Sequence, residues 1–284
     1  MTPFMLLIGC IITLLMLARP FLYKPIAVYF PAELSSAFTS IWVLFGVIVT
    51  LPFFYDSLNP HVLINHPIAL CVTAVKGIVL WLLIKYQQVL NKVSTSSSVF
   101  YAFIAMAFGT LLMNLFFGEN LSPIHLSVII ALGVLGFVFM FKGDLKRLSK
   151  KDKLIFAVLV CLMTYAIVAD HVSINAFGWY PHLVISTLVM LICSIIYGIS
   201  KTDLKNILTN PKVIVAGFVY TFGEFVITFA NVNIMPVSFV SLFNRLSAPL
   251  AMIISAKIYH EQTIKNQALF GLLAFGLSLI IIFT

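Results

Sequence analysis

The chain has 284 residues, of which 62% are hydrophobic and 9% are charged, and its formal net charge is +8. Soluble domains hold about 45–50% apolar and about 25% charged residues, so this composition excludes an ordinary soluble domain. The apolar residues run continuously instead of alternating with polar ones, which favours an all-α integral membrane protein over a transmembrane barrel. The basic residues lie at the ends of the apolar runs, where they act as topology signals and contact lipid headgroups, so we expect no nucleic-acid partner.

Ten apolar segments have about the 20 residues that a helix needs to cross a bilayer core of about 30 Å. Several of them begin at a proline, which suits the first turn of a helix. In chain order they are Pro3–Ala18, Glu33–Phe54, Pro67–Tyr86, Ser94–Gly118, Ser122–Phe141, Leu154–Ala176, Pro181–Ile199, Pro211–Val232, Pro236–Tyr259 and Thr263–Phe283. Most connections are short, so neighbouring helices should be antiparallel. We interpret the first segment as a retained membrane helix, because it has no basic region before it and no cleavage site after it.

The four cysteines give no sign of a metal or redox site. They are Cys10, Cys71, Cys161 and Cys193, and each lies within an apolar run without a C-x-x-C pairing. Cysteines in this setting are most often small buried hydrophobic residues. We therefore expect no metal and no cofactor.

One polar and basic connection, Lys142–Lys153, separates residues 1–141 from residues 154–284. Each half holds five predicted helices. The end of the first half, Phe116–Phe141, aligns without a gap on Ile258–Phe283, and Glu119 then falls on Glu261. Since five is an odd number, the second half enters the membrane in the opposite orientation. The sequence therefore predicts two inverted five-helix repeats, an arrangement typical of secondary transporters that bind substrate near the midplane.

The last two helices of each half carry a family resemblance. The stretch "RLSAPLAMIISAKIYHEQTIKNQALFGLLAFG" contains Pro249, Glu261, Gly271 and Gly276; the first half keeps Glu119, Gly133 and Gly136, and has Ala107 where a proline is expected. This pattern resembles the drug/metabolite transporter (DMT) superfamily, EamA type. The resemblance implies ten helices in two inverted repeats and movement of small metabolites by alternating access. Glu119 and Glu261 are expected to stabilise helix starts, where a carboxylate complements the helix dipole.

The basic residues predict the orientation in the membrane. With ten spans, the lysines and arginines other than the deeply placed Lys76 and Arg245, including those of 142–153, all fall on one side. The positive-inside rule places that side in the cytoplasm and both termini outside, whereas many ten-helix members of the family keep both termini in the cytoplasm. We expect the bacterial inner (cell) membrane, and a monomer or a homodimer.

Three charges lie deep within apolar segments, namely Lys76, Glu224 and Arg245. Each is roughly 13–20 Å from the start of its predicted helix, so lipid would leave it unsatisfied and it should face the interior. In a functional interpretation, Arg245 binds a carboxylate, Glu224 binds a cationic group or a coupling proton, and Lys76 adds a second positive charge. The predicted substrate-binding residues are Arg245, Glu224, Lys76, Asn244, Ser241, Tyr220, Tyr101 and Trp81. The predicted gate or proton site is Asp170 and His171.

We consider four interpretations of these charges. The leading hypothesis is a secondary active transporter of a small polar or zwitterionic metabolite, such as an amino acid, with a coupling ion or counter-substrate. The second is an exchanger of phosphorylated or carboxylated anions. In the third, Glu224 and Arg245 simply form a buried ion pair. The fourth, a membrane-embedded enzyme, lacks the H-E-x-x-H, G-x-S-x-G or paired-Asp motifs that it would need, so we expect no enzymatic activity.

Overall fold

The computed structural model describes residues 2–27, 32–93, 95–140, 148–197, 201–259 and 264–283. This part of the chain is helical apart from short connections and one isolated bridge between Asn231 and Met235. The long helices are α1 (Pro3–Ala27), α2 (Ala32–Phe54), α4 (Pro67–Val93), α5 (Thr95–Phe116), α6 (Pro123–Phe139), α7 (Lys150–Phe177), α8 (Trp179–Ile196), α10 (Pro211–Asn233), α11 (Val237–Tyr259) and α12 (Ile264–Phe283).

Each predicted apolar segment corresponds to one of these helices, and most boundaries agree within a few residues. The clearest differences are α1 and α4, which continue past the predicted ends at Ala18 and Tyr86. Three short elements were not predicted: the 3-10 helix η1 (Tyr55–Leu58), α3 (Pro60–Asn65) and α9 (Lys201–Thr209). They lie in the connections between long helices, and they are too short or too polar to cross a membrane.

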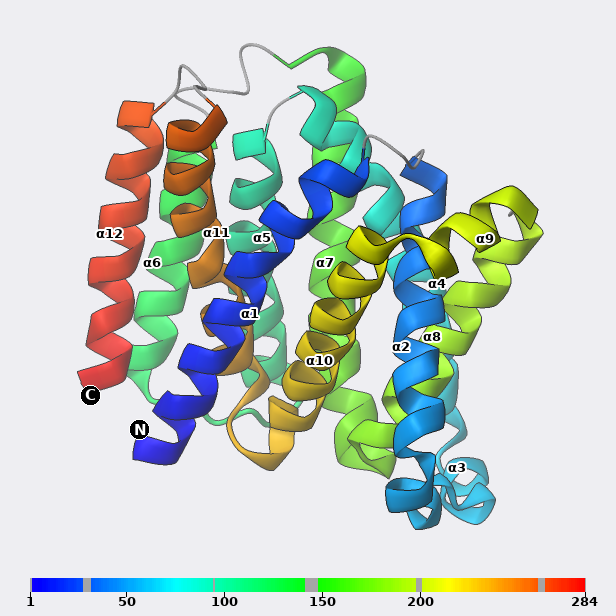
Figure 1. Cartoon of the computed structure of the whole chain (residues 1–284). Coiled ribbons are helices and arrows are strands. Elements are labelled where there is room, and N and C mark those ends of the chain that lie inside the picture. The colour runs from blue at the N-terminus through cyan, green and yellow to red at the C-terminus, as the bar shows by residue number, and fades with distance from the viewer. Residues whose placement is uncertain are drawn as a thin grey trace.

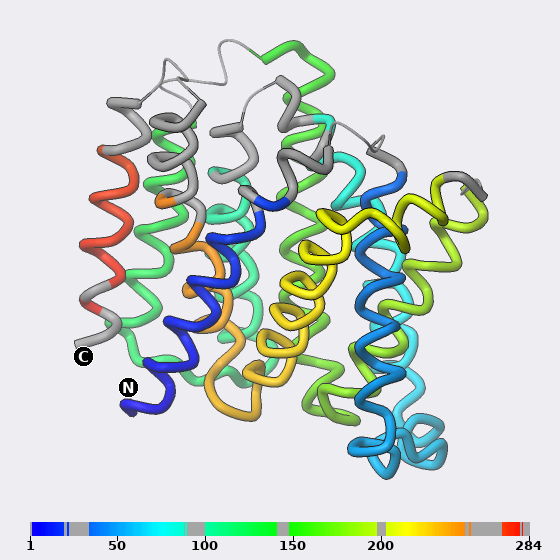
Figure 2. The backbone as a smooth tube through the Cα atoms, in the orientation of Figure 1, coloured from blue at the N-terminus to red at the C-terminus, as the bar shows by residue number. Residues whose placement is uncertain are grey.

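The long helices stand side by side in one bundle, with both termini at the same end (Figure 1). Helices α12 and α6 form one edge, and α2, α4 and α8 form the other. Figure 2 follows the same path through the described backbone, with α3 at the lower end and α9 at the upper right.

Five helices in the described part of the chain are long and apolar enough to span a bilayer. They run over Leu34–Leu58, Pro67–Gln87, Lys150–Phe177, Trp179–Ile196 and Pro211–Asn233. Large apolar side chains on the outside of the bundle, such as Phe53, Ile68 and Ile196, are 75–81% exposed. A continuous apolar exterior of this kind suits lipid and not water. The fold is therefore that of an all-α integral membrane protein.

The packing of helices from the two halves of the chain follows a pattern. Helix α1 packs against α10 and α11, and α7 packs against α4 and α5. In addition, α2 contacts α8, α5 contacts α11, and α6 contacts α12. The contacts that position the polar residues below are thus mainly contacts between the halves.

Small residues allow the closest approaches between helices. A Cβ atom added to Gly133 on α6 would lie 2.3 Å from the Cβ atom of Ala107 on α5. A Cβ atom added to Gly217 on α10 would lie 2.4 Å from the indole of Trp42 on α2. Small residues at helix contacts are how membrane helices gain van der Waals packing without a hydrophobic driving force.

Candidate functional site

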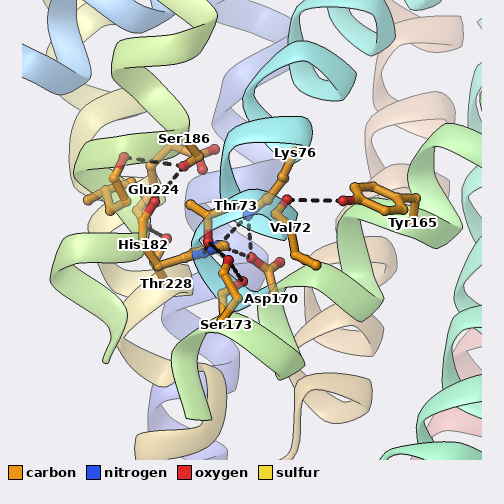
Figure 3. Close-up of polar contacts among 12 residues, drawn as sticks. Val72, Thr73, Lys76, Tyr165, Asp170, Ser173, His182, Ser186, Glu224 and Thr228 are labelled. Carbon is orange, nitrogen blue, oxygen red and sulfur yellow. Dashed lines mark hydrogen bonds and ion pairs between the residues drawn. The ribbon is translucent and has the colours of Figure 1, made fainter. Parts of the chain in front are cut away.

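The most densely connected polar cluster joins Lys76 on α4, Asp170 on α7 and His182 on α8 (Figure 3). The Lys76 Nζ atom forms an ion pair with Asp170 Oδ1 and lies 2.9 Å from His182 Nε2. His182 Nε2 is in turn 2.8 Å from the same Asp170 oxygen. Lys76 and His182 are buried, so the three side chains satisfy one another away from lipid.

Hydroxyl groups hold the imidazole of His182 in place. Thr73 Oγ1 lies 3.2 Å from His182 Nδ1 and donates a hydrogen bond to the carbonyl of Ala69. Ser186 donates to the carbonyl of His182 itself. Both nitrogen atoms of the ring therefore have polar partners, and the ring orientation is fixed from α4 as well as from α7.

A second ion pair joins Arg19 on α1 to Glu224 on α10, with 2.8 Å between Arg19 Nη2 and Glu224 Oε1. Arg19 also donates to the carbonyl of Tyr220 at 3.2 Å, and its guanidinium lies 3.9 Å from the centre of the Tyr220 ring. The guanidinium fits because residue 223 is glycine: a Cβ atom there would lie 2.7 Å from Arg19 Nη2. The interpretation in which Glu224 and Arg245 form a buried ion pair is therefore wrong, since the partner of Glu224 is Arg19.

Arg245 on α11 has no acidic partner among the described residues. Its Nη2 atom lies 3.1 Å from the sulfur of Met163, a weak acceptor, and its buried Nε atom has no hydrogen-bond partner. Tyr101, Arg19 and Glu224 are its electrostatic neighbours. The hydroxyl of Tyr101 is also without a hydrogen-bond partner, although that side chain is fully buried. The Nε atom of Arg245 and the hydroxyl of Tyr101 are therefore hydrogen-bond donors in the interior without an acceptor among the described residues.

The other predicted site residues divide into two groups. Tyr220 and Ser241 lie on the helices that carry Glu224 and Arg245, and Asn244 precedes Arg245 and accepts a hydrogen bond from Ser247 through its carbonyl. Trp81 lies elsewhere, since its ring packs on Tyr197, 4.6 Å between ring centres, and beneath Lys85.

Asp170 and His171 do not act on the same cluster. Asp170 pairs with Lys76 and His182, whereas the ring of His171 donates from Nε2 to the carbonyl of Phe117, 2.9 Å away. Successive residues on a helix point in different directions, which separates the two side chains. The histidine beside Asp170 in space is His182, which is not among the predicted site residues.

Glu119 stabilises the start of α11, and not the start of α6, the helix that follows it in the chain. It lies in the connection before α6, and its carboxylate accepts hydrogen bonds from the backbone N–H of Ser238, at 3.0 Å, and from the Ser238 hydroxyl. Ser238 is in the first turn of α11, where a carboxylate satisfies free N–H groups and the dipole. Glu261 lies outside the described residues.

Two open, apolar grooves lie on the sides of the bundle. One, of about 360 Å³, lies between α4 and α7 beside Tyr165, and the other, of about 530 Å³, lies between α6 and α12. Neither is lined by Lys76, Glu224 or Arg245. Within the described ranges, no three His, Cys, Asp or Glu side chains converge on a metal-binding position.

Comparison with known proteins gives no relative for this chain: no family model matches the sequence, and no curated protein matches it.

Proposed function

We propose that the protein is a secondary active transporter of a small zwitterionic metabolite, such as an amino acid or a derivative of one. The observation that carries this proposal is the unpaired guanidinium of Arg245. A charge inside a membrane protein is costly, and it is usually paired or used. Lys76, Arg19, Asp170 and Glu224 are all paired, whereas Arg245 has, among the described residues, only a thioether sulfur within hydrogen-bonding distance.

In this proposal, the substrate carboxylate binds Arg245 and the hydroxyl of Tyr101. Both groups have hydrogen-bond donors without an acceptor in the part of the chain that the structure describes, and a carboxylate supplies acceptors for both. The substrate ammonium binds near Glu224, whose Oε1 is held by Arg19 and whose side chain is 26% exposed. The carboxylate of the substrate thus binds Arg245 on α11, and its ammonium binds near Glu224 on α10.

The fold proposed for this function is that of two inverted five-helix repeats, 1–141 and 154–284. Two features of the packing support it. Each half directs its first helix against the third and fourth long helices of the other half, α1 on α10 and α11, and α7 on α4 and α5. Each of these first helices also forms an ion pair with the third long helix of the other half, but with the signs exchanged: Arg19 to Glu224, and Asp170 to Lys76.

The contact of Glu119 with Ser238 agrees with the same symmetry at the level of sequence. The gapless alignment of the halves that places Glu119 on Glu261 also places Ser96 on Ser238. Both halves thus contain the same two residue types at equivalent positions. This internal match supports the resemblance to EamA-type drug/metabolite transporters, ten membrane spans and alternating access between the halves.

The excess of basic residues at one end of the bundle supports an orientation with the 142–153 connection in the cytoplasm and both termini outside. The composition and this asymmetry suit the bacterial inner membrane.

A thermal-shift screen of the purified protein tests the proposed function. Amino acids, their derivatives, organic phosphates and quaternary amines are compared on the native chain and on Arg245→Leu. Zwitterions should stabilise the native protein and not the variant, because only the variant lacks the guanidinium that binds their carboxylate. Trp81→Leu serves as the control, since Trp81 packs away from Arg245, and its shift should equal that of the native chain. Equal stabilisation of the native chain and Arg245→Leu would contradict the proposal.

A second candidate function, exchange of organic anions, is favoured by one observation. Within the described ranges, the Nε atom of Arg19 is buried without a hydrogen-bond partner, as is that of Arg245, so two guanidinium groups retain free donors in the same region. A dianionic phosphate uses both, whereas a zwitterion uses one. Stabilisation by organic phosphates that is lost in both Arg19→Met and Arg245→Leu would favour this second function.

A further inference from the structure

The cluster of Lys76, Asp170 and His182 has a geometry that ion pairing alone does not explain. Three atoms, Lys76 Nζ, Asp170 Oδ1 and His182 Nε2, lie within hydrogen-bonding distance of one another, with 2.9 Å from Nζ to Nε2 and 2.8 Å from Nε2 to Oδ1. A lysine and an aspartate would neutralise each other without a third partner. The imidazole therefore adds something other than charge balance.

The other side of the ring fixes its tautomer. The Thr73 hydroxyl donates its proton to the Ala69 carbonyl, so its oxygen is left to accept a hydrogen bond from His182 Nδ1. The proton of the neutral ring is then on Nδ1, and Nε2 has one lone pair that points into the cluster.

With this tautomer, Nε2 makes one of two hydrogen bonds. When Nε2 is unprotonated, it accepts from the ammonium of Lys76, and its lone pair faces the lone pairs of Asp170 Oδ1 at 2.8 Å. When Nε2 binds a proton, it donates to Asp170 and gives up the bond from Lys76. The same positions of the atoms thus fit two states that differ by one proton on Nε2, with Lys76 paired to Asp170 in both.

The protonation state of Nε2 depends mainly on the residues of the cluster itself. Asp170 interacts electrostatically with Lys76 and His182, and His182 with Lys76 and Asp170. The described part of α2, which packs on α4 and α8, has no titratable side chain between Leu34 and Phe54. Other titratable groups on the elements packed around the cluster include Tyr165 and His171 on α7, Tyr180 on α8, Tyr101 on α5, Tyr220 and Glu224 on α10, Arg245 on α11, and Tyr55, Asp56, His61 and His66 around η1 and α3.

The cluster lies toward a defined end of the bundle. His182 lies one turn after the start of α8, at the end of the bundle where α7 ends and α4 begins. In the orientation proposed above, this end faces away from the cytoplasm. Counted along their helices, Glu224 and Arg245 lie about two turns from this end, so His182 is nearer to the external water.

We propose that His182, set between Lys76 and Asp170, is the site that binds and releases the coupling proton of transport. The role of this proton in transport rests on the proposed function, whereas its binding to His182 does not. The proton comes from external water, forms the N–H bond at Nε2, and converts the bond from Lys76 into a bond to Asp170. Release on the other side reverses the change, so that no other reactant is needed.

Proton binding is tested by NMR of isotopically labelled histidine side chains in the full chain, embedded in lipid nanodiscs. His182→Gln identifies the resonance of His182. We expect this ring to change from the Nδ1–H tautomer to the doubly protonated form as the pH is lowered from about 8 to about 3. Asp170→Asn removes the anion that accepts the new N–H, so the midpoint should fall by about one pH unit or more. His171→Gln is the matched control and should leave the His182 titration unchanged. A ring that keeps one protonation state throughout this range, or a midpoint that Asp170→Asn does not move, would overturn the proposal.

Coupling is tested in proteoliposomes that contain a pH-sensitive dye, with a mixture of the standard amino acids as the probe. The native protein should acidify the lumen on addition of the mixture, and His182→Gln should lose this acidification while it still exchanges labelled amino acids across the membrane. Acidification that persists in His182→Gln would overturn the role of His182 but leave the transporter intact. If the native protein shows neither exchange nor acidification, the proposed function fails for amino acids, and the NMR titration still decides the proton site.

Discussion

The pairing of Glu224 with Arg19, and not with Arg245, is a prediction that can be measured as a coupling free energy. The two changes are Arg19→Met and Glu224→Gln, alone and together. Arg19 makes three contacts, namely the ion pair, the bond to the Tyr220 carbonyl and the stacking on the Tyr220 ring. Glu224 makes only the first of these contacts through its side chain, so Arg19→Met should destabilise the protein more than Glu224→Gln.

The magnitude follows from the geometry and the exposure of the pair. A hydrogen bond between charged groups contributes about 1.5–3 kcal/mol, and removing one partner of a fully buried pair costs about 3–5 kcal/mol. The Arg19 and Glu224 side chains are 16% and 26% exposed, so part of their interaction is screened. We therefore expect a coupling free energy of about 1–2 kcal/mol, which is above the average of about 0.6 kcal/mol for hydrogen bonds between membrane helices. The cation–π contact should add about 0.5–1 kcal/mol to the loss in Arg19→Met.

The assay is reversible unfolding in mixed micelles by a denaturing detergent, analysed as a double-mutant cycle. The matched cycle combines Glu224→Gln with Arg245→Leu, and its coupling should be smaller. A third arm, Gly223→Ala, places a methyl group 2.7 Å from Arg19 Nη2 and should weaken the pair without removing either charge. A coupling between Glu224 and Arg245 that equals or exceeds that between Glu224 and Arg19 would refute this reasoning.

Three further predictions concern packing, capping and orientation. Gly217→Ala should lower the free energy of unfolding by about 1–3 kcal/mol, because its methyl group would overlap the ring of Trp42. The control Gly276→Ala, whose methyl group would have no atom within 4 Å, should be neutral or slightly stabilising. Equal effects of the two variants in detergent unfolding would contradict the close approach of α10 and α2. Glu119→Gln should cost about 1 kcal/mol in the same assay, because it removes the charged acceptor of Ser238, and an unchanged stability would show that the cap contributes nothing. A cysteine at Lys150, in a chain without its four native cysteines, should react with an impermeant reagent only after the cells are opened, and reaction in intact cells would reverse the assigned orientation.

The long helices could be predicted from the sequence because a membrane helix satisfies its own backbone and needs only an apolar run of sufficient length. The short elements α3 and α9 could not, since six to nine residues in a connection carry little periodic signal. The first predicted segment ends at Ala18, immediately before a charged residue and a proline. In the structure, α1 continues to Ala27, so Arg19 lies within the helix and reaches Glu224.

The members of the candidate site were predicted better than their partners. Lys76, Glu224, Arg245 and Asp170 stand out in the sequence because a charge within an apolar run is rare. Which charges meet depends on helix packing, and the sequence offered no restraint on the rotation of one helix against another. His182 was overlooked for the same reason: its role depends on Lys76 and Asp170, which are far from it in sequence. An unusual signal was available, since His182 follows Tyr180 and Pro181 at the start of an otherwise apolar helix.

The central claim is that Arg245 has no acidic partner among the described residues because the substrate supplies its partner. The most direct measurement is exchange of labelled amino acids by proteoliposomes that contain the native chain, Arg245→Lys or Arg245→Leu. We predict exchange by the native chain, little exchange by Arg245→Lys, because lysine lacks the planar fork that binds a carboxylate, and none by Arg245→Leu, with all three proteins folded and inserted to the same extent. Exchange by Arg245→Leu at the native rate would contradict the claim and leave Arg245 with a structural role only.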